Sequence, residues 1–170
     1  MALFGSKRVF KARSDMNVVD VSETRGIRSL HLGTEAIQSS MKVNAPFELV
    51  LEYSRCMLGF LLFHPQPREI LLIGLGGGSI AKWTHKFLPQ ANTTAVEINP
   101  QVIAVARSHF FLPANDERLN VMEGDGAAYV AGRSGIADVL LVDGYDSVAI
   151  APALDNDHFY RHCYDALTPD

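Results

Sequence analysis

Three acidic residues in the second half of the chain stand where carboxylates can do chemistry, each at or just after a short apolar run. Glu97 lies in TTAVEI, Asp125 follows RLNVMEG, and Asp143 follows ADVLLV. If these runs are parallel strands, the three carboxylates meet at the sheet edge where open α/β sheets bind ligands. Glu97 is placed to accept hydrogen bonds from both ribose hydroxyls, and Asp125 from an adenine amino group. The simpler alternatives are an acid favoured at a helix start for Glu97 and a helix N-cap for Asp125.

A glycine-rich turn precedes these acids in the stretch LLIGLGGGS, where Gly74, Gly76 and Gly78 form a GxGxG pattern. Such a turn between a strand and a helix lets the backbone approach a ligand closely and directs helix N–H groups toward it. The dinucleotide fingerprint GxGxxG would need glycine at position 79, where Ser79 stands. Three carboxylates around one pocket also suit an adenosine carrying a sulfonium cation better than an anionic pyrophosphate. The pattern therefore favours an S-adenosyl compound over NAD.

The elements that must position these residues alternate between strand and helix from residue 69 onward. Strands are expected at 69–74, 93–98, 118–124 and 137–144, and helices at 79–88, 99–110, 125–132 and 156–167. Asn99 is expected to cap the second helix, with Pro100 at its first position. This alternation predicts an α/β fold with a doubly wound, mostly parallel, Rossmann-like sheet.

The first 68 residues have a different pattern. Residues 16–23, 26–33 and 35–40 alternate apolar and polar side chains, which predicts a small antiparallel β unit, and residues 46–63 have the pattern of an amphipathic helix. We therefore expect an N-terminal β-strand unit at 1–45, a connecting helix and linker at 46–68, and a nucleoside-binding α/β domain at 69–170. The chain stops straight after a helix, so the C-terminal strands of such a sheet are expected to be missing.

Composition and charge exclude several classes of protein. The chain of 170 residues has no apolar run long enough to span a membrane and no secretory signal pattern, and its two cysteines lack CxxC spacing, which predicts a cytoplasmic protein. Residues 91–170 hold 12 acidic against 4 basic residues, which argues against nucleic-acid binding. That charge suits a cationic substrate or ordinary solvated helix faces.

His158 and His162 lie at i, i+4, but no third candidate ligand is evident, so no metal site is predicted.

These motifs together resemble the spermidine synthase (polyamine aminopropyltransferase) family, which shares the fold of class I S-adenosylmethionine-dependent methyltransferases. The resemblance runs through LLIGLGGGS, VEINPQVIAVAR, NDERLNVMEGDGAAYV and DVLLVDGYD. It implies aminopropyl transfer from decarboxylated S-adenosylmethionine to a diamine or polyamine, with no metal. It implies Asp143 as the base and Asp146 as the group that holds the cationic acceptor, and it places Gln38 and Tyr53 in contact with donor or acceptor. A homodimer follows only by analogy with the family.

The chain departs from the family pattern at three places. Gly77 replaces the loop aspartate that holds the donor's amine in the family, Ser54 and Arg55 follow Tyr53 in place of His and Glu, and Ser147 replaces a proline. Two alternatives to aminopropyl transfer therefore stay open. One is a methyltransferase that uses S-adenosylmethionine itself on a small amine, and the other is a non-catalytic homologue that binds a nucleoside.

Overall fold

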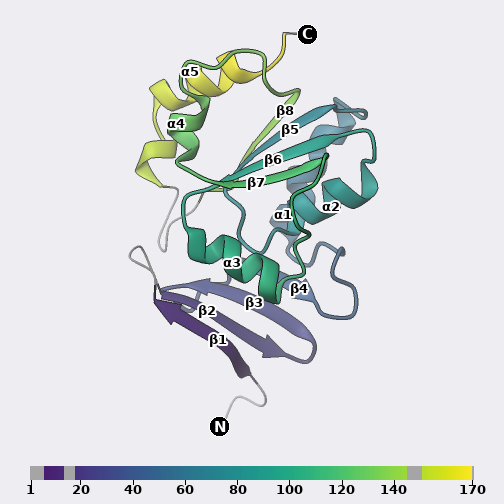
Figure 1. Cartoon of the computed structure of the whole chain (residues 1–170), viewed down its shortest axis with the longest axis vertical. Coiled ribbons are helices and arrows are strands. Elements are labelled where there is room, and N and C mark those ends of the chain that lie inside the picture. Colours follow the sequence, from purple (N-terminus) through teal and green to yellow (C-terminus); the bar gives the residue numbers. More distant parts are fainter. Residues whose placement is uncertain (1–5, 14–17, 145–150, 170) are drawn as a thin grey trace.

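The computed structural model describes residues 6–13, 18–144 and 151–169. Within these residues the chain forms two four-stranded sheets, one parallel and one antiparallel. Figure 1 shows the antiparallel sheet at the N-terminal end of the molecule and the parallel sheet, with its helices, at the other end.

The parallel sheet has the strand order β7-β6-β5-β8. Its strands are β5 (Glu69–Ile73), β6 (Asn92–Glu97), β7 (Leu119–Glu123) and β8 (Val139–Val142), and each neighbouring pair is parallel. β5 pairs with β6 on one side and with β8 on the other, so the strand order reverses direction at β5. The carboxyl ends of β5 and β8 therefore flank the topological switch point at which α/β sheets bind ligands.

Helices cover both faces of this sheet, as the alternating pattern predicts. On one face lie α1 (Glu52–Met57), the 3-10 helix η1 (Leu58–Leu62), α2 (Ser79–Phe87) and α3 (Pro100–His109), and on the other lie α4 (Gly126–Val130), η2 (Pro152–Leu154) and α5 (Asp157–Ala166). Successive residues of β5 point to opposite faces. Ile70 and Leu72 join the core beneath α2, and Leu71 and Ile73 join the core beneath α5. The doubly wound fold is confirmed.

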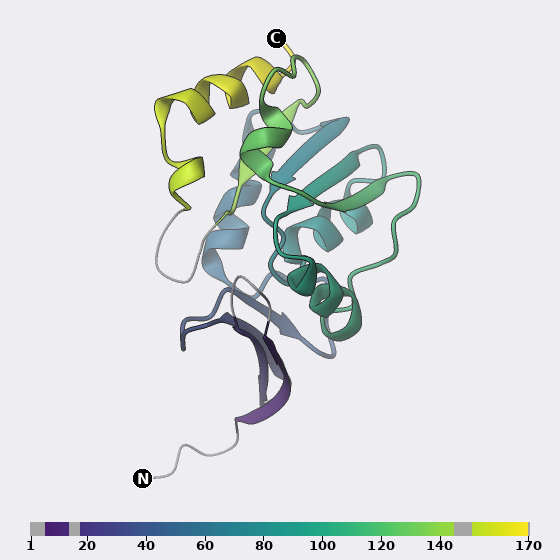
Figure 2. The ribbon, with the colours of Figure 1, turned by 60° about the vertical axis from the view of Figure 1, so that its left-hand side comes forward.

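The antiparallel sheet consists of β1 (Lys7–Arg13), β2 (Val18–Thr24), β3 (Ile27–Leu32) and β4 (Ser39–Lys42). Sequence analysis predicted β2 and β3 but not β1, whose basic residues are mostly exposed and leave little apolar alternation to detect. Val21 and Leu30 pack against Val102, Val105 and Phe110 of the α3 region, so α3 joins the two sheets. Figure 2 shows this small curved sheet beside α3.

The single helix expected over residues 46–63 is wrong in its extent. Residues 44–49 pass through turns, with the Glu48 amide donating to the carbonyl of Ala45, and α1 begins only at Glu52. The apolar residues that gave the stretch its helical pattern pack in two ways. Leu49 is buried beside a turn, whereas Leu58 and Leu61 pack from η1 against the core beneath α2.

Across the described ranges of the chain, no helix combines the length and apolarity that a membrane crossing needs.

Candidate active site

A cavity of about 600 Å³ opens at the carboxyl ends of the parallel strands, a volume within the range of small-molecule sites. Residues from the N-terminal unit, the glycine turn and the ends of β6 and β8 line it together. Seven of the nine residues predicted for the site are among them: Gln38, Tyr53, Gly74, Gly76, Glu97, Asp125 and Asp143. The fold thus brings together residues as far apart as 38 and 143.

Asp143 directly follows β8, and its backbone amide donates to the carbonyl of Ile73 at 2.7 Å. Burial raises the pKa of its carboxyl to about 6, while the hydrogen bond from Tyr53 lowers it and the charge of Glu97 raises it. A carboxyl with a pKa near 6 is ionised at neutral pH, yet it is a stronger base than an ordinary aspartate. Asp143 therefore combines the position and the proton affinity that a general base needs.

Tyr53 connects Asp143 to the N-terminal unit. Its hydroxyl lies 3.3 Å from Oδ2 of Asp143 and 3.2 Å from the carbonyl oxygen of Gln38. A phenol carries one proton, so it can donate to only one of these two acceptors at a time. When Asp143 is ionised, the hydroxyl can donate to it. When Asp143 is protonated, the hydroxyl can instead donate to Gln38 and accept from Asp143, so this contact can serve both protonation states of the base.

Glu97, at the end of β6, is 8% exposed and orders the glycine turn. Its Oε2 accepts from the Leu75 amide at 2.9 Å, and its Oε1 accepts from the Asn99 amide at 2.9 Å. Burial raises the pKa of its carboxyl, and these backbone donors lower it. Glu97 thus holds the turn and the start of α3 in place while its side chain lines the cavity, and its proposed contact with a ribose remains a prediction.

Asp125 has the N-cap role that was the simpler alternative. Its Oδ1 accepts from the amides of Ala127 at 2.8 Å and Ala128 at 3.3 Å, at the start of α4. The same side chain lines the cavity. Capping and ligand binding are compatible, because a carboxylate has a second oxygen.

The glycine turn approaches the other residues of the site closely. Gly74 has a φ of 95°, and a Cβ atom there would lie 2.3 Å from the carbonyl oxygen of Asp143. Only glycine fits between β5 and the end of β8 in this way. Gly76 also lines the cavity, whereas Gly78 is the N-cap of α2 and packs against Leu112 instead of lining it.

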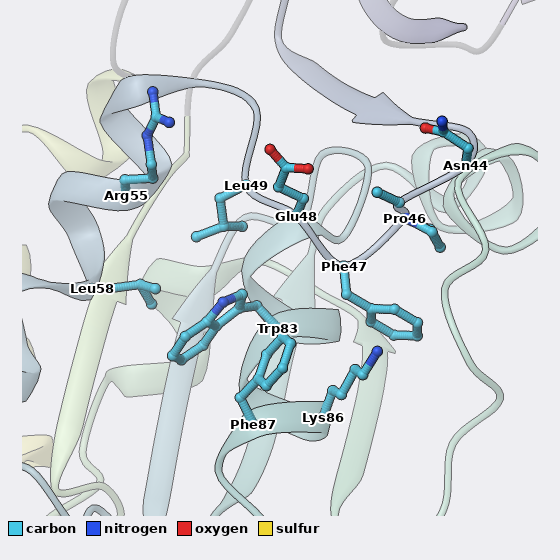
Figure 3. A pocket seen from close by; sticks show the side chains of 11 residues that line it. Asn44, Pro46, Phe47, Glu48, Leu49, Arg55, Leu58, Trp83, Lys86 and Phe87 are labelled. Carbon is cyan, nitrogen blue, oxygen red and sulfur yellow. The ribbon is translucent and has the colours of Figure 1, made fainter.

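Asp146 falls outside the described residues, so its predicted contact with the acceptor is not tested. Arg55, which replaces an acid of the family pattern, lines a second cavity that holds Phe47, Trp83 and Lys86, as Figure 3 shows. The positive charge of Arg55 is therefore not part of the lining of the large cavity.

Sequence reasoning missed several lining residues. Asn99 was recognised only as the cap of α3, which it is: its Oδ1 accepts from the Gln101 amide at 3.0 Å. Ala36 and Ile37 form an apolar wall from the N-terminal unit. Their signal was weak, because apolar residues in a loop before a strand are unremarkable. Ile37 is nevertheless 51% exposed, a feature that only the structure reveals.

The charge of the large cavity is negative. Its described lining holds the carboxylates of Glu97, Asp125 and Asp143 and contains no lysine, arginine or histidine. A cationic ligand with polar donors fits such a lining, and an anionic pyrophosphate would be repelled. Within the part of the chain that the structure describes, no three His, Cys, Asp or Glu side chains gather as ligands of a metal ion would.

The chain is similar to known proteins over most of its length. Residues 50–170 match the spermine/spermidine synthase domain family. The polyamine aminopropyltransferase of Chromobacterium violaceum is 50% identical over 163 residues, which are 96% of this chain and 62% of that protein. The polyamine aminopropyltransferase of Neisseria meningitidis serogroup A is 48% identical over 171 residues, which are 100% of this chain and 65% of that protein.

A solved spermidine synthase, in complex with the transition state analogue AdoDATO, has the same fold. It aligns with a TM-score of 0.78 at 24% identity, over 95% of this chain and 55% of that one. The chain thus spans somewhat less than two thirds of the length of these relatives.

Proposed function

The chain belongs to the spermine/spermidine synthase family, and from this premise we propose that it transfers an aminopropyl group from decarboxylated S-adenosylmethionine to a diamine or polyamine. The observation that carries the proposal is the position of Asp143. It is a partly buried carboxylate with a raised pKa of about 6, at a strand end, in a cavity lined by two further acids.

The donor suits the acidic half of the cavity. Its adenosine would lie along the ends of β6 and β7, with the ribose hydroxyls near Glu97 and the adenine amino group near Asp125. Its sulfonium and its primary amine are both cations. The described lining provides negative charge and holds no lysine, arginine or histidine that would compete for it. Gly74 and Gly76 line the cavity without side chains, so the ligand can approach the backbone there.

The acceptor chemistry requires removal of a proton. An alkylamine is protonated in neutral water, so its nitrogen has no free electron pair until a base takes that proton. Asp143 accepts it. The freed nitrogen then attacks the carbon bound to the sulfonium, the C–S bond breaks, and its electron pair returns to sulfur as a neutral thioether, methylthioadenosine. The raised pKa of Asp143 brings the base closer to the pKa of the amine and so lowers the cost of the proton transfer.

The proposal is tested by incubating the chain with decarboxylated S-adenosylmethionine and diamines of different lengths. We expect release of methylthioadenosine together with an equal amount of the aminopropylated amine. Methylthioadenosine binding without turnover on any amine would instead indicate a chain that only binds the nucleoside. Neither binding nor turnover would reject the assignment of the cavity.

A second candidate, methyl transfer from S-adenosylmethionine, is favoured by one observation. A Cβ atom on Gly77 would lie 2.8 Å from Cδ1 of Phe110 and 2.8 Å from Oγ of Ser39. Since Phe110 is fully buried, the turn has no room for a side chain at position 77 that would bind the amine of the donor. Methylation of a small amine by S-adenosylmethionine, with no release of methylthioadenosine, would support this candidate over the first.

A further inference from the structure

A second, much smaller cavity adjoins Asp143. Its volume is about 10 Å³, close to what one water molecule requires. Asp143, Tyr53 and Gly74 line both this cavity and the large one, so the carboxylate of Asp143 lies between them. The rest of the small cavity is formed by apolar residues and by three serines. The hydroxyl of Ser54 already donates to the Leu51 carbonyl at 2.7 Å. The other two serines are Ser39 of β4 and Ser79 of α2.

The hydroxyls of Ser39 and Ser79 have unused hydrogen-bonding capacity. Their oxygens lie 3.3 Å apart, so one hydroxyl donates to the other. That bond uses one of the two hydroxyl protons, and the second proton needs another acceptor. Among the described residues, neither hydroxyl makes a further hydrogen bond. Ser39 is only 4% exposed, so its side chain is shielded from bulk water.

We infer that this cavity holds one ordered water molecule, which joins the hydroxyls of Ser39 and Ser79 to the carboxylate of Asp143. The water accepts the remaining hydroxyl proton and donates one of its own protons to the carboxylate. It donates its second proton to the oxygen of the other serine, which gives it three polar partners, the usual number for a buried water. The water positions Asp143 from the side opposite to the substrate and takes no part in the bond changes.

The inference gives the two serines a role in tuning the base. A hydrogen bond donated to a carboxylate stabilises its ionised form. Two other titratable groups act on Asp143: Tyr53 of α1 donates to it, and Glu97 of β6 repels its charge. A third group, Asp125, lines the same cavity. None of these three changes when the serines are replaced, so the effect of the water can be separated from theirs.

The inference builds on the proposed role of Asp143, and two experiments test it without any measurement of turnover. The first is a high-resolution crystal structure of the chain. We expect an electron-density peak within hydrogen-bonding distance of Asp143 and of Ser39 or Ser79. A cavity without density, or one closed by the surrounding side chains, would overturn the inference.

The second experiment is a titration of Asp143 by carbon NMR of the labelled carboxyl. In the double variant Ser39→Ala Ser79→Ala we expect the pKa of Asp143 to rise by about half a unit to one unit, the size of one net hydrogen bond. Ser79→Thr keeps the hydroxyl and Ser108→Ala changes an exposed serine, so both should titrate like the parent chain. If the double variant does not fold, Ser79→Ala is titrated instead. An unchanged pKa would contradict the inference, whether or not the chain transfers an aminopropyl group.

Discussion

The Tyr53 hydroxyl lies 3.3 Å from Oδ2 of Asp143 and joins the first helix of the chain to the end of its last described strand. The same hydroxyl lies 3.2 Å from the carbonyl oxygen of Gln38. The proposed base is thus positioned by the N-terminal unit as well as by the sheet that carries it. The proposed catalytic role of Asp143 therefore depends on contacts that cross the boundary between the two units.

The first prediction concerns this contact. Tyr53→Phe removes the hydrogen bond that lowers the pKa of Asp143, so we expect the pKa to rise above about 6. A loss of one hydrogen bond to a charged group corresponds to about one unit. NMR titration of the carboxyl checks it. Tyr164→Phe, which changes a tyrosine that is 79% exposed, is the matched control and should leave the titration unchanged.

The second prediction is that Asp143→Asn abolishes aminopropyl transfer but leaves methylthioadenosine binding within a few-fold of the parent chain. Asparagine keeps the shape of the side chain but cannot accept the amine proton at neutral pH. Turnover and calorimetric binding are measured on the same preparation, with Asp165→Asn on the exposed part of α5 as control. Loss of binding together with turnover would assign Asp143 a structural role.

The pH dependence of transfer is the third prediction. Because burial raises the pKa of Asp143 to about 6, the base is ionised above this value and protonated below it. We therefore expect kcat/KM for transfer, which reports the pKa values of the free enzyme, to fall about tenfold per unit as the pH drops below 6. An acid limb with its midpoint near the ordinary value of aspartate would show that Asp143 is not the group that titrates.

A fourth prediction addresses nucleoside binding. Glu97→Gln places an amide N–H₂ group where the carboxylate now accepts from the Leu75 or the Asn99 amide. The loss of a hydrogen bond to a charged group, with the turn loosened, should weaken methylthioadenosine binding by about 10- to 100-fold. Calorimetry measures the change, and Glu123→Gln, an exposed acid at the end of β7, is the control. Equal binding by the two variants would show that Glu97 does not contribute to nucleoside binding.

The fifth prediction concerns Lys82, which is fully buried in α2 and whose Nζ donates to the Phe110 carbonyl at 2.6 Å. Burial lowers the pKa of its amine from 10.5 to about 8. Between these values the unfolded chain binds the proton and the folded chain does not, so this residue makes the folded state gain stability as the pH rises from 8 to 10.5. Lys82→Met should lose this gain, which is on the order of 1–3 kcal/mol. Denaturant unfolding at pH 8 and pH 10 checks it, and equal pH dependence in both chains would refute it.

The α/β half of the fold was predictable because its signals are local. The apolar runs of β5 and β8, the Asn99 cap and the proline after it specify their elements without help from distant residues. The strand-end positions of Glu97, Asp125 and Asp143 then follow from parallel pairing alone. The N-terminal unit was harder, since β1 is mostly exposed and the apolar residues of 46–63 divide between turns and two short helices.

The contacts between the two units could not be predicted from the sequence. The approach of Tyr53 to Asp143 joins residues 90 positions apart, and the Ser39–Ser79 contact joins residues 40 apart. No local pattern encodes such pairs, because each joins elements that are distant in the sequence: α1 with the end of β8, and β4 with α2. The packing of Phe110 over Gly77 is of the same kind. It gives a steric reason for the absence of the family's aspartate at position 77, and the sequence alone does not reveal that reason.

The central claim is that the large cavity binds the adenosine of a sulfonium donor. Calorimetry of the purified chain with methylthioadenosine, S-adenosylhomocysteine and NAD tests it most directly. We predict that methylthioadenosine binds most tightly and that NAD does not bind, because its pyrophosphate would face Glu97, Asp125 and Asp143. A preference for S-adenosylhomocysteine would favour methyl transfer, and a preference for NAD would contradict the account of this cavity.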